Sequence, residues 1–163
     1  LAAATDLLAA GIQVLHIAGP TQVAEVAADA PAAVEGEPAY VVLPYVDHME
    51  LAYAAADLML CRAGAMTCAE LSAVGLPGAY VPLPHGNGEQ RFNAEPIVEA
   101  GGGLLIADAD LQPPWLRGTL IPLLTDPPRL AQMSARAAEL GRRDADERLA
   151  DMVLEAARTG VQS

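Results

Sequence analysis

The sequence predicts an α/β fold in which helices wrap both faces of a mainly parallel sheet, a doubly wound arrangement. Short apolar runs of roughly four to six residues, the length of buried strands, alternate with longer stretches of helical periodicity. Glycine and proline separate the two kinds of segment, with no repeat or low-complexity linker between them. Strands that are joined through helices form βαβ units, whose sheet is covered on both faces. One domain is expected over residues 1–163.

Composition supports a folded core. Of the 163 residues, 53% are hydrophobic and 18% are charged, which excludes intrinsic disorder. No apolar run reaches the roughly 18 residues that a membrane-spanning helix needs, and the first twenty residues lack the basic stretch of a signal peptide.

The charge balance excludes several classes of function. The chain has 9 basic and 21 acidic residues, a formal net charge of −12, and every basic residue is arginine. Such an acidic chain is repelled by nucleic acid. Without lysine there is no Walker A loop and no Schiff-base chemistry. The two cysteines and three histidines show no metal-ligand spacing, so no metal is expected, and the thiols are interpreted as reduced, in a cytoplasmic protein.

The first part of the chain predicts three helices and two strands. Alanine-rich helical periodicity opens the sequence and ends at Gly11. Asp47 is a candidate N-cap for the third helix. In order, the segments are helix Leu1–Ala10, strand Gln13–Ala18, helix Thr21–Ala30, strand Tyr40–Leu43 and helix Asp47–Ala56.

The second part predicts three more strands and a helical tail. Pro96 lies inside one helical stretch and predicts a kink or break there. The tail from Pro113 is helical, with breaks expected at Pro122, at Pro127-Pro128 and near Gly141. In order, the preceding segments are strand Asp57–Arg62, helix Ala65–Val74, strand Gly78–Leu83, helix Glu89–Ala100 and strand Gly103–Ala107.

Ligands of doubly wound sheets bind beyond the carboxyl ends of the strands. Four loops occupy that position, and the one between Arg62 and Thr67 carries the strongest local signal. Here a buried strand passes through Ala63-Gly64 into a helix, whose free N–H groups suit a phosphate. The Thr67 hydroxyl could add a hydrogen bond, and Glu70, on the same face, could accept from both hydroxyls of a ribose. The alternative is a capping box, Thr67-x-x-Glu70, that only stabilises the helix start.

The second candidate loop runs from Pro84 to Gln90. It is rich in glycine and ends in polar residues at a helix start. Gln90 and Asn93 can each donate and accept hydrogen bonds, as recognition of sugar hydroxyls requires. The alternative is an ordinary exposed loop whose glycines serve its turns.

These segments together resemble the carboxyl-terminal domain of the MurG family, the UDP-N-acetylglucosamine:undecaprenyl-pyrophosphoryl-N-acetylmuramoyl-pentapeptide N-acetylglucosaminyltransferases. The motifs occur in the family's order from about Val14 to Asp108. They are Tyr45-Val46-Asp47-His48-Met49, Ala54–Asp57, Cys61-Arg62-Ala63-Gly64-Ala65-Met66-Thr67-Cys68-Ala69-Glu70, Gly75-Leu76-Pro77, Val81-Pro82, His85–Asn93 and Ala100-Gly101-Gly102-Gly103.

The resemblance implies a GT-B architecture of two Rossmann-like halves with the active site between them. Residues 1–163 match only the carboxyl-terminal half, which binds the UDP-sugar donor, and its first strand is expected to precede Leu1. The acceptor domain and the catalytic base belong to the other half. The isolated chain is therefore expected to be inactive.

The resemblance also implies the residues that contact the donor. Val46 is expected at the uracil, the amides of the loop and helix start at the diphosphate, Glu70 at the ribose, and Gln90 with Asn93 at the sugar. Arg62 is expected to orient the loop or balance phosphate charge. The full set is Val46, Arg62, Gly64, Ala65, Met66, Thr67, Cys68, Ala69, Glu70, Gln90 and Asn93. Ala18 departs from the family, many of whose members have a serine there.

The implied reaction transfers N-acetylglucosamine from UDP to lipid I, forming lipid II of peptidoglycan with inversion at the anomeric carbon. No cofactor beyond the substrate UDP-N-acetylglucosamine is implied. The expected location is peripheral, on the cytoplasmic side of the bacterial cell membrane, with the lipid and the membrane contacted by the other half. Two alternatives stay open: the donor half of another UDP-sugar transferase or of a UDP-sugar 2-epimerase, and a non-catalytic nucleotide-binding module.

Overall fold

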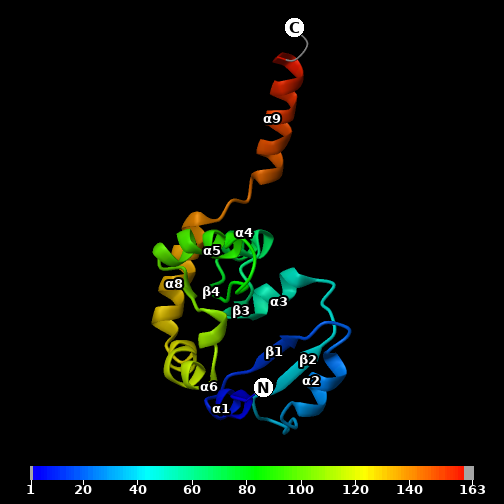
Figure 1. The fold of residues 1–163 in the computed structure, drawn as a ribbon, viewed down its shortest axis with the longest axis vertical. Coiled ribbons are helices and arrows are strands. Elements are labelled where there is room, and N and C mark those ends of the chain that lie inside the picture. Colours follow the sequence, from blue (N-terminus) through cyan, green and yellow to red (C-terminus); the bar gives the residue numbers. More distant parts are fainter. Residues whose placement is uncertain (1, 160–163) are drawn as a thin grey trace.

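A computed structural model of the chain describes residues 2–159, and helices alternate with short parallel strands over most of that range (Figure 1). The elements in chain order are α1 (Ala4–Ala9), β1 (Val14–Ile17), α2 (Val23–Asp29), β2 (Tyr40–Leu43), α3 (Met49–Ala55), β3 (Met59–Cys61), α4 (Ala65–Val74), β4 (Gly78–Tyr80), α5 (Glu89–Glu99), β5 (Gly103–Leu105), η1 (Asp108–Asp110), α6 (Pro113–Trp115), η2 (Leu116–Leu120), α7 (Ile121–Leu124), α8 (Pro127–Leu140) and α9 (Ala145–Thr159). The expected parallel α/β class is confirmed.

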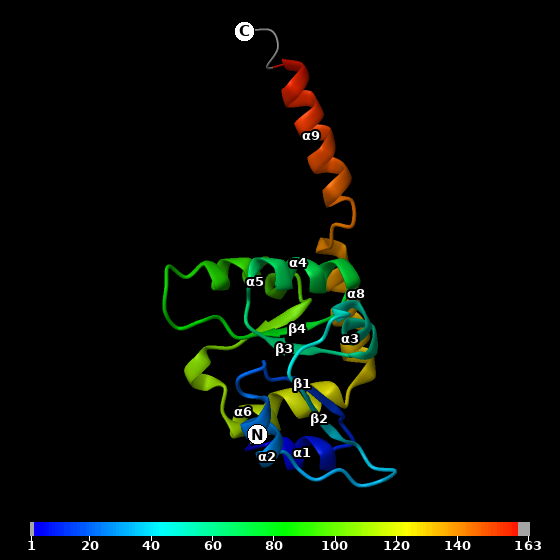
Figure 2. The ribbon, with the colours of Figure 1, turned by 90° about the vertical axis from the view of Figure 1, so that its right-hand side faces the viewer.

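The main body is a three-stranded sheet in the order β3-β4-β5, all parallel. Figure 2 shows α4 and α5 lying over one face of this sheet. Leu71 of α4 and Ile97 of α5 pack there with Tyr80 of β4 in one core cluster. On the other face, Ala79 of β4 packs with Leu120 in a second cluster. Helices cover both faces, as the doubly wound prediction requires.

The expected single sheet is divided in the structure. Strands β1 and β2 pair in parallel, Val14 opposite Tyr40, and form a separate two-stranded sheet. In Figures 1 and 2, β1 lies on the side of this small sheet that is nearer β3. Within residues 2–159, no strand pairs with the outer edge of β1 or with the outer edge of β3.

Two helices complete the described chain. The side chain of Asp126 caps α8 by accepting a hydrogen bond from the Arg129 amide at 3.2 Å, and α8 ends before Gly141 as predicted. Helix α9 projects away from the body (Figure 1). Among the described residues, no helix combines the length and apolar character needed to cross a bilayer.

Three local predictions are wrong. Asp47 does not cap α3, because that helix begins one residue later, after His48, and no side chain accepts a hydrogen bond at its start. Pro96 does not break α5, so of the kink or break expected there, the break is wrong. Burial of Ala94 and Ile97 on its two sides stabilises the helix against the proline penalty of about 3 kcal/mol. Pro122 lies in the first turn of α7, where its missing N–H costs little.

Candidate functional site

The candidate site lies where the carboxyl ends of β3, β4 and β5 meet at one edge of the three-stranded sheet. The loop 62–64 follows β3, the loop 81–88 follows β4, and Ile106 and Ala107 follow β5. Parallel pairing brings these three loops side by side, because the strands all run in the same direction. Two of them are the loops that the sequence marks as candidates for ligand binding.

The start of α4 presents backbone N–H groups at this edge. The first hydrogen bond of the helix runs from the Cys68 amide to the Gly64 carbonyl at 2.9 Å. The amides of Ala65, Met66 and Thr67 therefore precede the helical ladder. A methyl group added to Gly64 would meet only the Thr67 hydroxyl, at 3.7 Å, so the approach to these amides is open. The arrangement suits an anion such as a phosphate.

The capping-box alternative is wrong. The helix begins after Gly64, which makes Thr67 its third residue instead of its N-cap, and no side chain caps this helix start. Glu70 lies within the helix and is exposed. Its carboxylate accepts a hydrogen bond from the Tyr53 hydroxyl at 2.7 Å, so it is anchored to α3. Both side chains are thus left for a role other than capping.

Arg62 ties the three loops together. Its guanidinium donates to the carbonyl of Val81 at 3.2 Å, to the carbonyl of Pro82 at 3.4 Å and to the carboxylate of Asp108. The partners follow β4 and β5, whereas Arg62 itself follows β3. Of the two roles expected for Arg62, orienting the loop matches these contacts, because the Asp108 carboxylate balances the charge of the guanidinium.

Asn93 and Gln90 each use one end of the side-chain amide to hydrogen-bond the backbone of a loop. Asn93 of α5 donates from Nδ2 to the Ala63 carbonyl at 3.1 Å. Gln90 accepts a hydrogen bond from the Leu83 amide at 3.1 Å on Oε1. The opposite ends of both amides make no hydrogen bond within residues 2–159, so Asn93 keeps an acceptor and Gln90 a donor. Their predicted contacts with sugar hydroxyls stay untested.

The other residues of the turn after β3 and of the start of α4 are partly exposed and partly buried. Met66 and Ala69 are exposed at the start of α4. Ala63 and Cys68 are buried in the first core cluster, and burial raises the pKa of the Cys68 thiol. Because the Cys68 amide belongs to the helical ladder and its thiol to the core, Cys68 supports the helix from below and offers no free polar group. Its expected contact with the donor stays a prediction.

Val46 follows the small sheet and not the three-stranded sheet. It is half-buried in the loop between β2 and α3, which follows a strand of the small sheet, as does Ala18 after β1. The structure therefore assembles Arg62, Gly64, the start of α4, Gln90 and Asn93 at one edge, with Val46 on a separate loop.

Sequence reasoning missed two residues of the site, Tyr53 and Asp108. The position of Asp108 after β5 was a usable signal, because polar residues at the carboxyl ends of parallel strands gather at one edge. Tyr53 had no such signal, since its contact with Glu70 depends on how α3 packs on α4.

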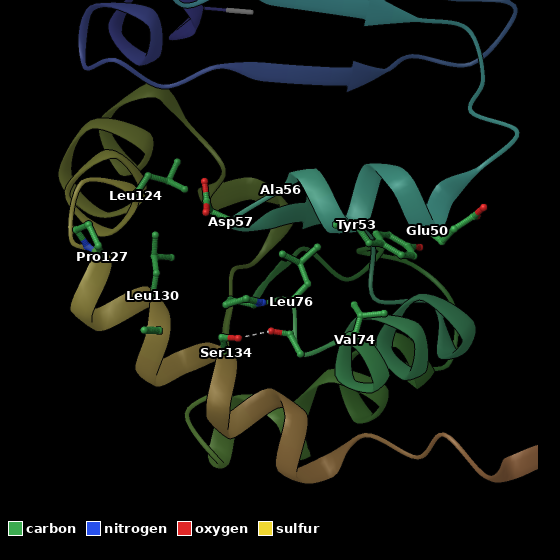
Figure 3. Close-up of a pocket in the computed structure, with 14 residues that line it drawn as sticks. Glu50, Tyr53, Ala56, Asp57, Val74, Leu76, Leu124, Pro127, Leu130 and Ser134 are labelled. Carbon is green, nitrogen blue, oxygen red and sulfur yellow. Dashed lines mark hydrogen bonds between the residues drawn. The ribbon is translucent and has the colours of Figure 1, made fainter.

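A groove of about 590 Å³ lies elsewhere, between α3, the end of α4 and α8, near the starting ends of β3 and β4 (Figure 3). The Ser134 hydroxyl donates to the Gly75 carbonyl at 2.7 Å across it. No group of three or more His, Cys, Asp or Glu side chains that could hold a metal ion occurs among residues 2–159.

Known proteins resemble this chain over most of its length. A curated relative from Acidothermus cellulolyticus, named UDP-N-acetylglucosamine–N-acetylmuramyl-(pentapeptide) pyrophosphoryl-undecaprenol N-acetylglucosamine transferase, is 67% identical over 157 residues, 96% of this chain and 42% of the relative. A protein of the same name from Streptomyces avermitilis is 62% identical over 147 residues, 90% of this chain and 39% of the relative. The chain thus spans about two fifths of the length of these relatives.

The fold agrees as well. The crystal structure of Acinetobacter baumannii MurG matches 88% of this chain and 43% of that protein, with a TM-score of 0.78 and 29% sequence identity. That protein is a GT-B glycosyltransferase, so the α/β fold of this chain is the fold of part of such an enzyme. The glycosyltransferase family 28 C-terminal domain matches residues 2–149, and the chain belongs to this family.

Proposed function

We propose that residues 1–163 are the donor-binding half of a transferase that takes N-acetylglucosamine from UDP-N-acetylglucosamine and passes it to an undecaprenyl-pyrophosphoryl N-acetylmuramyl pentapeptide. The observation that carries the proposal is the open helix start at Gly64, with Glu70 anchored one turn further along α4. The names of relatives at 67% and 62% identity agree with it.

The chemistry of this half follows from its backbone. The diphosphate binds the amides of Ala65, Met66 and Thr67, and the Thr67 hydroxyl adds a further donor. Glu70 accepts hydrogen bonds from the ribose, and Gln90 and Asn93 use their free groups on the sugar. When the sugar–phosphate bond breaks, negative charge grows on the departing UDP, and fixed amides stabilise that charge without reorganising.

The divided sheet supports a further part of the proposal, a parallel strand from outside residues 1–163 that fills the place between β1 and β3. In a parallel strand, the backbone N–H and C=O groups of successive residues point alternately to the strand on one side and the strand on the other. The Val14 amide bonds toward β2, and the Met59 amide bonds toward β4. Leu15 and Leu60 therefore turn their backbone groups to the outer edges. These two residues are 46% and 41% exposed, although parallel strands are normally buried on both faces.

With that strand in place, the order becomes β2-β1-new-β3-β4-β5. If the new strand comes first in the chain, this is the 3-2-1-4-5-6 order common to dinucleotide-binding folds. Acceptor binding, the catalytic base and contact with the cytoplasmic face of the membrane are assigned, within the same proposal, to the rest of the protein.

Titration calorimetry of the full-length protein with UDP tests the nucleotide site. Glu70→Ala should lower the affinity by about 2–4 kcal/mol, because a pair of charge-assisted hydrogen bonds is lost. Glu99→Ala is the matched control, an exposed glutamate at the far end of α5, and should bind UDP as the parent does.

Absence of UDP binding by the parent protein would overturn the donor-site proposal. Equal binding by Glu70→Ala and the parent would overturn only the ribose assignment. Competition between UDP-N-acetylglucosamine and UDP-glucose then separates this site from the sites of enzymes that use other UDP-sugars, since a site specific for the acetamido sugar favours the first.

A further inference from the structure

Tyr53 makes the one side-chain hydrogen bond that Glu70 forms within residues 2–159. The Tyr53 hydroxyl on α3 donates to Oε2 of Glu70 on α4 at 2.7 Å, a contact between residues 17 positions apart. Glu70 itself is exposed on the helix surface. An exposed glutamate with no partner samples many rotamers, so this contact restricts the carboxylate to one region.

The tyrosine ring is a firm support for this bond. It is half-buried and packs against the first core cluster, which includes Leu71 and Tyr80. Figure 3 shows Tyr53 on α3, at the margin of the groove between that helix and α4. Because a tyrosine side chain has only two torsions and this ring is packed, its hydroxyl stands at a fixed place.

The bond leaves a defined part of the carboxylate free. Oε2 of Glu70 is occupied by the Tyr53 hydroxyl, whereas Oε1 keeps its lone pairs. Burial, followed by the hydrogen bond to Glu70, raises the pKa of the Tyr53 phenol well above its usual value. The phenol is therefore protonated at neutral pH and donates to the carboxylate.

We propose that Tyr53 is a positioning residue: it holds the Glu70 carboxylate at the start of α4 so that Oε1 meets a ligand carrying sugar hydroxyls. The inference rests on the proposed nucleotide site and deepens it. Binding then costs less rotamer entropy, because the carboxylate is already ordered before the ligand arrives. The gain applies only to a ligand whose hydroxyls contact Glu70, so Tyr53 contributes to the choice of a ribose over an analogue that lacks the 2′- and 3′-hydroxyls.

The test compares the affinities of UDP and 2′,3′-dideoxy-UDP, which lacks both ribose hydroxyls, for the full-length protein by titration calorimetry. In Tyr53→Phe the ring stays and only the hydroxyl is lost. UDP should bind about three- to tenfold more weakly, as expected for loss of one supporting hydrogen bond, with little change for 2′,3′-dideoxy-UDP. The preference for UDP over its dideoxy analogue should shrink by the same factor.

Tyr40→Phe is the matched control. The Tyr40 hydroxyl is also hydrogen-bonded, to Nδ1 of His16 at 2.9 Å, but it lies on the small sheet. This variant should keep the parent's preference, and melting temperatures of both variants report on folding.

The outcomes separate the two proposals. If the parent prefers UDP, Glu70→Ala loses that preference and Tyr53→Phe retains it in full, the positioning role is overturned and the donor site stands. Equal weakening of both nucleotides by Tyr53→Phe makes Tyr53 a structural residue and also overturns the positioning role. If the parent binds neither nucleotide, the donor site itself is overturned.

Discussion

The two sheets of this chain differ sharply in how well they are covered. Every residue of β4 in the three-stranded sheet is buried, and both core clusters pack on that sheet. In the two-stranded sheet, the paired residues Leu15 and Val41 are 46% and 45% exposed, and α2 beside it has no buried residue. The phosphate-loop candidates stand on the covered sheet, so the geometry of the helix start is supported by a complete core.

This difference teaches that the two parts contribute unequally to the stability of residues 1–163. The covered sheet supplies most of the apolar burial, which is the main favourable term in folding. The small sheet is stabilised by fewer buried contacts and, in the proposed arrangement, by the additional strand that pairs with the outer edge of β1. Four changes, taken from the largest expected effect to the smallest, test this comparison.

Shortening one apolar side chain at each sheet should show the largest difference in stability between the two sheets. Leu71 is fully buried in the first cluster, and Leu71→Ala should lower the free energy of unfolding by about 3 kcal/mol through lost burial and the cavity left behind. Leu15→Ala on β1 removes a half-exposed side chain and should cost under about 1 kcal/mol. Urea denaturation of residues 1–163 measures both. Equal costs would contradict the unequal stability of the two sheets.

Filling a tight helix–sheet contact should have the next largest effect. A methyl group on Gly102 would lie 2.8 Å from the Ala137 backbone in α8, so Gly102→Ala should cost about 2 kcal/mol by forcing the helix outward. Gly118→Ala is the control, because a methyl group there meets nothing within 4 Å and helix propensity favours alanine by about 1 kcal/mol. Opposite shifts in melting temperature are expected. A stabilised Gly102→Ala would show that α8 does not press on the sheet.

Alkaline pH should weaken the covered sheet through its thiols. Burial raises the pKa of Cys61 to about 12 from the ordinary 9.0, so the thiol stays protonated in the fold while the unfolded chain ionises. The contribution of Cys61 is complete below pH 9 and is lost as pH rises toward 12, by about 1.4 kcal/mol at pH 10.

The free energy of unfolding, measured at pH 7 and pH 10, should therefore fall less in Cys61→Ala than in the parent. Leu60→Ala, a change at the neighbouring residue of β3 that does not titrate, should keep the parent's pH dependence. The same fall in Cys61→Ala as in the parent would refute the assignment.

The smallest effect concerns one polar atom in the core. The Tyr80 hydroxyl is buried and has no hydrogen-bond partner within the described chain. Tyr80→Phe should therefore leave stability unchanged or raise it by up to about 1 kcal/mol, because an unpaired buried polar group is unfavourable. Thermal unfolding measures the change. A loss of stability would reveal a partner for this hydroxyl, such as an ordered water.

The sequence was sufficient for features that depend on neighbouring residues. Helix α4 has the predicted bounds, Ala65–Val74, because Gly64 precedes it and Gly75, with φ of 75°, ends it in the left-handed conformation. The turn from β3 into α4, the candidate phosphate loop, was predictable for the same reason, since the strand, the turn and the helix start are consecutive in the chain.

Features that depend on distant residues were not predictable. The hydrogen bond from Tyr53 to Glu70 requires the packing of two helices, and the ion pair of Arg62 with Asp108 joins residues 46 positions apart. The division of the sheet was also missed, because alternating strands and helices give the order of elements in the chain but not which strand edges pair.

The shared guanidinium of Arg62 has a consequence for anyone who sets out to redesign the proposed donor site. Arg62 bonds to Val81, Pro82 and Asp108. The segments after β3, β4 and β5 therefore cannot be replaced independently of one another. A graft of residues 81–88 from a relative with a different sugar donor would have to preserve the backbone carbonyls that Arg62 grips. Transplanting the arginine and the aspartate together with the new segment is the safer design.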